Sequence, residues 1–128
     1  MRRREPEQTV NTDRRSSRQR CGDAAEAQAL QFLERAGLQL VEKNFRCRGG
    51  EIDLIMRAGT SLVFVEVRSR SSLQFGGALA SVTPAKQAKL LHAAQVYLLR
   101  LPRLPACRFD LVAIDQGHIQ WLQNVIVT

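Results

Sequence analysis

The chain has 128 residues, of which 45% are hydrophobic and 24% charged, an ordinary composition for one globular domain. No uninterrupted apolar run approaches the length that spans a bilayer, so we expect no membrane-spanning helix. The basic segment 1–6 is followed by no apolar stretch, so we also expect no secretory signal.

The three cysteines, Cys21, Cys47 and Cys107, are odd in number and far apart. Their spacing matches no zinc motif and indicates no disulfide framework. We therefore expect three small, partly buried side chains in a reduced, cytoplasmic protein.

The net charge of +7 is unevenly distributed. Residues 1–20 hold seven arginines against three acids, whereas residues 21–128 hold twelve basic residues against nine acids. We expect residues 1–20 to be a disordered basic tail and residues 21–128 to form a single domain. A basic protein favours polyanionic partners, chiefly nucleic acid, although solubility alone also explains the charge.

The first predicted element is a helix from Asp23 to Ala36. Its apolar residues recur on one face at a spacing of 3.6, and Gly37 ends it. Glu26 lies along the edge of that apolar face, beside the core rather than on the watery side.

Three strands follow, joined by a basic loop at Phe45–Gly50 and a turn around Gly59–Thr60. A second helix is predicted from Pro84, with Thr83 as its N-cap, to about Arg100. The strands are expected at 38–44, 51–56, 62–68, 108–114 and 118–122. This order favours an α/β sandwich, in which helices flank a mixed β-sheet of about five strands.

Two acids on adjoining strands carry the main functional hypothesis. Strand alternation places Glu51, Asp53 and Ile55 on one face of the sheet and Ile52, Leu54 and Met56 on the other. If Gly59 and Thr60 are the central turn residues, the numbers of paired residues sum to 119.

With this register, Asp53 lies opposite Glu66, and Glu51 lies opposite Arg68. Opposed Cβ atoms are roughly 4.5–5.5 Å apart, so the two carboxylates repel unless a proton or a divalent cation intervenes. Mg²⁺ accepts one or two carboxylates as ligands and can activate water beside a phosphate. The alternative is a simple cross-strand ladder with a Glu51–Arg68 salt bridge.

Several blocks of the sequence resemble the YraN family of small bacterial proteins. The resemblance covers nearly all of the chain beyond the tail. The matching blocks are Gly22–Glu26, Asn44–Arg48, Gly50–Ile55, Phe64–Arg70, Val82–Gln87 and Arg108–Asp110. That family in turn resembles the restriction-endonuclease-like nucleases and archaeal Holliday-junction resolvases, whose pattern is a helix Glu, a strand Asp and then Glu-x-Lys.

The resemblance implies a role for each matching residue. Asp53, Glu66 and the Val67 carbonyl would bind Mg²⁺ or Mn²⁺, and Glu26 would act in the outer shell or on the attacking water. Arg68 stands at the lysine position; it is always protonated and so is no base, but it can clamp a phosphate. Lys86 is a candidate for the missing amine, although a solvated helix residue explains it as well.

Arg46, Arg48 and Arg70 flank the predicted site and are candidates for phosphate contacts, or simply members of basic loops. The function that the resemblance implies is a metal-dependent endonuclease acting on DNA. The alternatives are a catalytically degenerate nucleic-acid-binding module and an interaction protein that keeps the nuclease fold. Junction resolvases of this class are dimers, but no feature of the sequence identifies an interface.

Overall fold

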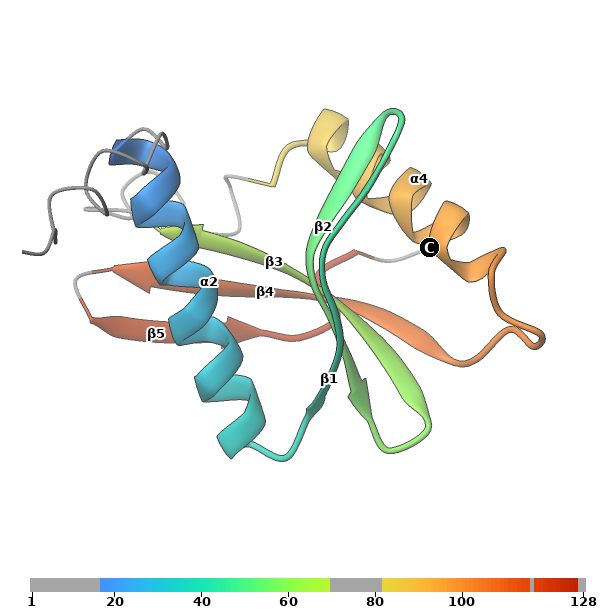
Figure 1. Ribbon diagram of the computed structural model, residues 1–128, viewed down its shortest axis with the longest axis horizontal. Coiled ribbons are helices and arrows are strands. Elements are labelled where there is room, and N and C mark those ends of the chain that lie inside the picture. The colour runs from blue at the N-terminus through green and yellow to red at the C-terminus, as the bar shows by residue number, and fades with distance from the viewer. Residues whose placement is uncertain (1–16, 70–81, 116, 127–128) are drawn as a thin grey trace, which may run out of the picture.

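A five-stranded mixed sheet with helices on both sides forms the protein (Figure 1). The computed structural model describes residues 17–69, 82–115 and 117–126, with side chains from Gly22 onward. The elements are α2 (Ser17–Arg35), β1 (Gln39–Cys47), β2 (Gly50–Ala58), β3 (Ser61–Ser69), α4 (Pro84–Leu98), β4 (Cys107–Asp115) and β5 (His118–Leu122). Neighbouring strands are antiparallel except β3 and β4, which are parallel and connected through α4. The predicted α/β class and mixed sheet are confirmed.

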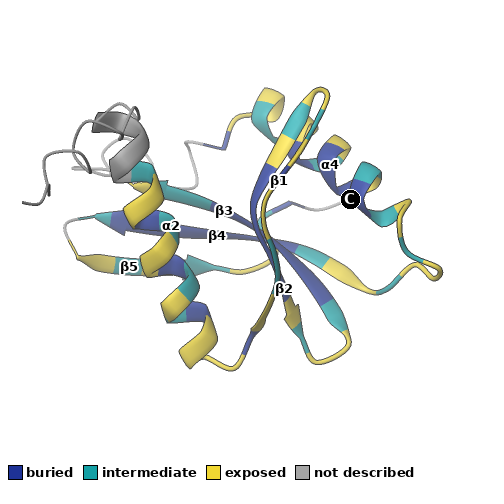
Figure 2. Ribbon diagram, in the orientation of Figure 1, coloured by how far each residue is buried: buried dark blue, intermediate teal, exposed yellow. Residues whose placement is uncertain are grey.

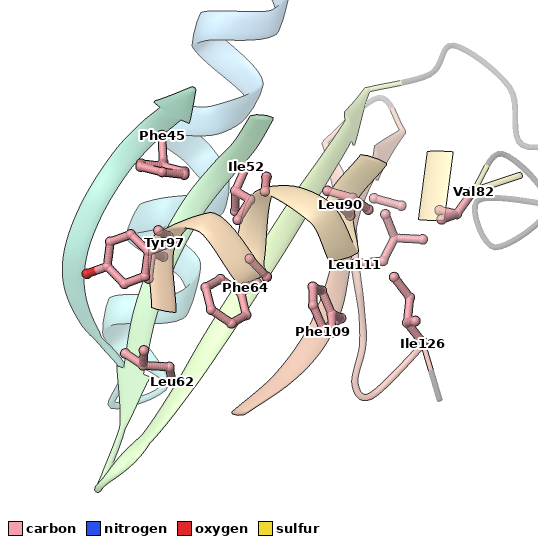
Figure 3. Close-up of a cluster of buried hydrophobic side chains, with 14 residues drawn as sticks. Phe45, Ile52, Leu62, Phe64, Val82, Leu90, Tyr97, Phe109, Leu111 and Ile126 are labelled. Carbon is pink, nitrogen blue, oxygen red and sulfur yellow. The ribbon is translucent and has the colours of Figure 1, made fainter. Parts of the chain in front are cut away.

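The two helices cover opposite faces of the sheet, and each face has its own apolar cluster. Phe64 of β3 packs with Leu90 and Tyr97 of α4 (Figure 3). Val63 and Val65 point the other way and pack in the cluster that includes Ala29 and Leu33 of α2. Strand β3 is therefore buried on both faces, and the centre of the sheet is dark blue in Figure 2.

Helix α2 begins earlier than the sequence predicts. Its first residue is Ser17 rather than Asp23, so residues 17–20 of the predicted basic tail belong to the helix. Residues 1–16 lie outside the described residues, and their disorder stays a prediction. At the other end, Gly37 adopts a φ of 102° and Leu38 N–H donates to the Leu33 carbonyl, which ends the helix as expected.

Helix α4 begins where the sequence predicts. Thr83 Oγ1 accepts the backbone N–H of Lys86 at 3.2 Å, and Pro84 is the first helical residue. Residues 70–81, which include Arg70, lie outside the described residues.

The predicted loop Phe45–Gly50 is wrong, because strand β1 continues to Cys47 and β2 begins at Gly50. Only Arg48 and Gly49 form the turn, and Gly49 has a φ of 94°, which a residue without a Cβ adopts freely. The segment is thus the tip of a tight β-hairpin rather than a six-residue loop.

Two expectations drawn from composition can be compared with the fold. Cys47 is half-buried and Cys107 exposed, and both are free thiols, so partial burial is wrong for Cys107. The side chain of Cys21 lies outside the described residues. In the described part of the chain, no helix has the length and apolar character needed to cross a membrane.

Asp110 on β4 fixes the C-terminal segment. Its side chain is fully buried and accepts from Arg108 Nε at 3.0 Å, Trp121 Nε1 at 2.9 Å and Asn124 N–H at 2.9 Å. Since both carboxylate oxygens are occupied by donors from within the domain, Asp110 has a structural role.

Replacing Asp110 with alanine should lower the free energy of unfolding by about 3 kcal/mol, because Arg108, Trp121 and Asn124 all lose a buried acceptor. Urea unfolding followed by circular dichroism measures the change. The exposed carboxylate of Glu34 provides the control, since Glu34→Ala should change the stability by less than about 0.5 kcal/mol. An Asp110→Ala variant as stable as the wild type would show that this network is dispensable.

Candidate functional site

Strands β2 and β3 pair over only part of their length. The ladder joins Leu54–Ala58 to Ser61–Val65, and every pair sums to 119, so the predicted register is confirmed over these five pairs. Asp53 and Glu66 are the next residues on each strand. From this point β2 pairs only with β1, and β3 only with β4, within the described residues. The sheet therefore forks where the two acids lie; we call this place the fork.

Strict alternation of faces fails beside the fork. Ile52 packs with Ile55 in the cluster on the α4 side, whereas Leu54 faces α2. The prediction that Ile52 shares a face with Leu54 is thus wrong. On β1, Asn44 has a φ of 52°, and the ladder skips the pair of Asn44 and Asp53. This local distortion of both strands explains why a period of two does not extend through Asp53.

The carboxylate of Asp53 bridges the fork. Its side chain is 8% exposed, and its Oδ2 accepts the N–H of Val67 at 2.8 Å. In an extended strand the N–H and C=O of one residue point to the same side, so the Val67 carbonyl also faces the fork.

Two cations reach Glu66, whose side chain is nearly as buried as that of Asp53. Arg68 Nη2 lies 3.1 Å from Glu66 Oε2, and Lys86 Nζ lies 3.6 Å from the same oxygen. Lys86 lies on α4, so the fold brings it to a carboxylate of β3. The Lys86 side chain is 40% exposed, so it contacts Glu66 and solvent at the same time.

Glu26 approaches Asp53 from α2. Its carboxyl group lies within hydrogen-bonding reach of the Asp53 carboxylate and of the Asn44 side chain. The helices α2 and α4 cover opposite faces of the sheet, yet Glu26 and Lys86 both contact residues of the fork. Because β2 and β3 separate here, side chains from both faces of the sheet can reach the same place.

Burial dominates the electrostatics of the three acids. Burial, then the charge of Asp53, raises the pKa of Glu66 from 4.5 to about 7, despite the opposing charges of Arg68 and Lys86. The same two causes raise the pKa of Glu26 to about 7. Burial also raises the pKa of Asp53, while its bond from the Val67 N–H lowers it. Further positive charge in the fork would therefore stabilise the ionised carboxylates.

The donors of the fork suit Mg²⁺ or Mn²⁺ better than zinc. Among the described residues, no three His, Cys, Asp or Glu side chains form a group that could hold a metal ion. The set consists instead of the two carboxylates of Asp53 and Glu66 with the Val67 carbonyl. Hard cations that keep several waters bind through such a partial set of oxygen ligands, whereas structural zinc requires four protein ligands.

The fork opens into a cavity of about 740 Å³. Glu26, Asp53, Glu66, Val67, Arg68 and Lys86 all line it, as does Arg46. Arg48 is not among its lining residues and lies exposed in the hairpin turn. The structure thus brings together every predicted catalytic and metal-binding residue. Of the arginines predicted to contact phosphate, Arg46 lines the cavity and Arg48 does not.

The predicted opposition of Glu51 and Arg68 is not formed, because the strands have already separated at that level. Glu51 lies 3.9 Å from Arg46 across the β1–β2 hairpin, and Arg68 turns to Glu66. The alternative of a simple Glu51–Arg68 salt bridge is therefore wrong.

Comparison with known proteins gives the family. The model of "Uncharacterised protein family UPF0102" matches residues 25–114. A UPF0102 protein of Janthinobacterium sp. (strain Marseille) is 55% identical over 112 residues, covering 88% of this chain and 91% of its own. One of Cupriavidus necator is 59% identical over 105 residues, covering 80% and 79%. The chain belongs to the UPF0102 family. UPF0102 is the YraN family, so that resemblance is confirmed.

Sequence reasoning missed several residues that shape the site of this UPF0102 protein. Asn44 supports Glu26, and an asparagine is the residue type, after glycine, that best tolerates a positive φ. Lys89 lines the cavity one helical turn beyond Lys86, a spacing that the sequence displays but that gains meaning only once Lys86 is placed.

The raised pKa of Glu26 makes stability depend on pH. A carboxyl whose pKa is higher in the folded state stabilises the fold below its unfolded value of 4.5, and this contribution is lost as the pH rises to about 7. In Glu26→Gln the side-chain amide can still donate a hydrogen bond to Asp53, but it has no proton that titrates between pH 5 and pH 8. In the presence of EDTA at pH 8, it should be about 1–2 kcal/mol more stable than the wild type.

Urea unfolding at pH 5 and pH 8 measures this difference, and Glu34→Gln on the exposed face of the same helix is the matched control. The gain should shrink at pH 5, where the wild-type carboxyl is protonated. A Glu26→Gln variant that loses stability equally at both pH values would contradict the contact with Asp53.

Proposed function

We propose that this UPF0102 protein is an endonuclease that hydrolyses phosphodiester bonds of DNA with Mg²⁺ or Mn²⁺. The observation that carries the proposal is the fork, where the carboxylates of Asp53 and Glu66 are both buried beside an open cavity and Glu66 contacts two cations. Buried acids with strongly shifted pKa values in a cleft are typical of functional sites.

Asp53, Glu66 and the Val67 carbonyl would hold the metal ion. When bound, the ion would neutralise charge on the phosphate and lower the pKa of a coordinated water. Glu26 adds a carboxyl with a pKa of about 7, the range in which a group both takes and returns protons at neutral pH. Its hydrogen bond to Asp53 also orients that carboxylate.

Arg68 and Lys86 would together perform the two functions of the lysine in the nuclease pattern, which are stabilising the phosphate and orienting the water. The planar guanidinium of Arg68 is permanently charged and suits a phosphate oxygen, where it stabilises developing negative charge. Lys86 brings an amine to the same Glu66 oxygen from α4 and orients the attacking water. An arginine at position 68 therefore does not remove the amine from the site.

The substrate is inferred from charge. Arg46 lines the cavity and Arg48 is exposed beside it, which adds positive charge for a phosphodiester backbone. Arg70 lies outside the described residues, and its predicted role stays a prediction.

A nucleic-acid-binding module without cleavage is the second candidate. The ion pair of the half-buried Arg68 with the buried Glu66 at 3.1 Å favours it, because an arginine that already neutralises Glu66 lowers the demand for a metal ion. Both candidates use the fork. In the nuclease, Glu66 would leave its ion pair with Arg68 to bind a metal ion, whereas in the binding module the ion pair would persist.

Asp53→Asn should abolish cleavage by the protein. The loss should exceed about 100-fold, because a metal ligand supports several kcal/mol of transition-state stabilisation. Plasmid, four-way-junction and single-stranded DNA are incubated with Mg²⁺ or Mn²⁺, and products are resolved on gels. Exposed Glu34 supplies the control variant Glu34→Gln, which should cleave as the wild type does. Undiminished cleavage by Asp53→Asn rules out the fork as the site.

Lys86→Gln separates the two candidates. For a nuclease, it should lower kcat by about 100-fold while DNA affinity falls only slightly, since one amine serves the reacting water. Single-turnover cleavage and fluorescence anisotropy measure the two effects. DNA binding by the wild type without cleavage under any of the metal conditions supports the binding module instead.

A further inference from the structure

The tip of the β1–β2 hairpin is seated on α4. A Cβ added at Gly50 would collide with the backbone carbonyl oxygen of Lys89. The neighbouring Gly49 faces the ring of His92, and His92 Nε2 lies 3.0 Å from the Arg48 carbonyl oxygen. Hairpin tip and helix lie together in Figure 1. Because the contact uses backbone on both sides, it fixes the position of the tip relative to α4.

The seated tip gives the cavity one strongly basic side. Arg46 and Arg48 lie on the hairpin, and Lys86 and Lys89 lie one turn apart on α4. Three of these four also line the cavity of the fork. Their chain positions are distant, so this basic side exists only because Gly50 allows the hairpin to contact the helix.

The α2 side of the fork has the opposite charge. Asp23 and Glu34 line a second cavity of about 570 Å³ between α2 and β1, together with Glu26, whose pKa is raised to about 7, and Lys43, the basic residue among the described side chains there. A polyanionic strand that enters the fork meets repulsion in that direction and attraction along α4.

We propose that the DNA backbone flanking the reacting phosphate runs along α4 and the hairpin tip, with Lys89 and Arg48 as phosphate contacts. Gly50 and His92 are positioning residues that hold the tip against the helix. This inference rests on the proposed function, since it assumes that DNA reaches the fork. A tip that is already fixed loses little conformational freedom when the strand binds.

The first test measures how DNA affinity depends on salt. Anisotropy with single-stranded and duplex oligonucleotides is recorded in EDTA, so that no cleavage occurs. The logarithm of the binding constant falls linearly as the logarithm of the salt concentration rises. Lys89→Gln and Arg48→Gln should each make this slope shallower by about 0.7–0.9, the value of one lost phosphate contact. Lys43→Gln and Arg57→Gln remove the same charge on the α2 side and at the far end of β2, and should leave the slope unchanged.

The outcomes distinguish this inference from the proposed function. If all four variants lower the slope equally, or none does, while the wild type binds and cleaves DNA, the path along α4 is wrong and the nuclease stands. If the wild type binds no DNA, the proposed function fails and the path fails with it.

The second test concerns the positioning residues. His92→Ala should weaken DNA binding about three- to tenfold with little change in the urea midpoint, and His92→Gln should restore binding because its amide can donate to the Arg48 carbonyl. Gly50→Ala should weaken binding further. Should Gly50→Ala fail to fold, the His92 pair still decides: equal binding by His92→Ala and the wild type contradicts the positioning role.

Discussion

One hydrogen bond, from the Val67 N–H to the carboxylate of Asp53, determines how the site is built. Where the ladder of β2 and β3 stops, this side chain takes the place of a backbone acceptor, so the strands part without leaving the Val67 donor unsatisfied. In a continuous sheet, the helices on the two faces would be separated by backbone. Here Glu26 of α2 contacts β2 at Asp53, and Lys86 of α4 contacts β3 at Glu66, on either side of the same opening.

Buried acids destabilise the fold at the fork, whereas a buried acid stabilises it in the core nearby. Asp110, on the neighbouring strand β4, is even more deeply buried, but three donors of the domain itself satisfy it, and it stabilises the fold. Asp53 and Glu66 share too few positive partners, and burial raises the pKa of both. Buried acids with raised pKa values destabilise the fold at neutral pH, and such costs are found mainly at functional sites.

The sequence was a sound guide where local rules decide. Gly59–Thr60 fixed the register of β2 and β3, and Thr83–Pro84 fixed the start of α4. It was a poor guide where tertiary contacts decide: the hairpin at Arg48–Gly49 and the turned Ile52 depend on α4 and on the distortion at Asn44. Lys86 could be named as a candidate from the sequence, but only the folded sheet shows which carboxylate it meets.

A sheet that forks has inner edges as well as outer ones. The segments of β2 and β3 beyond the last ladder pair carry backbone groups that face the opening rather than each other. Unpaired strand edges invite association with other chains, and proteins commonly guard them with charge. The buried acids and the basic hairpin guard this one. The charged side chains at the fork therefore lie where a strand of another chain would have to pair.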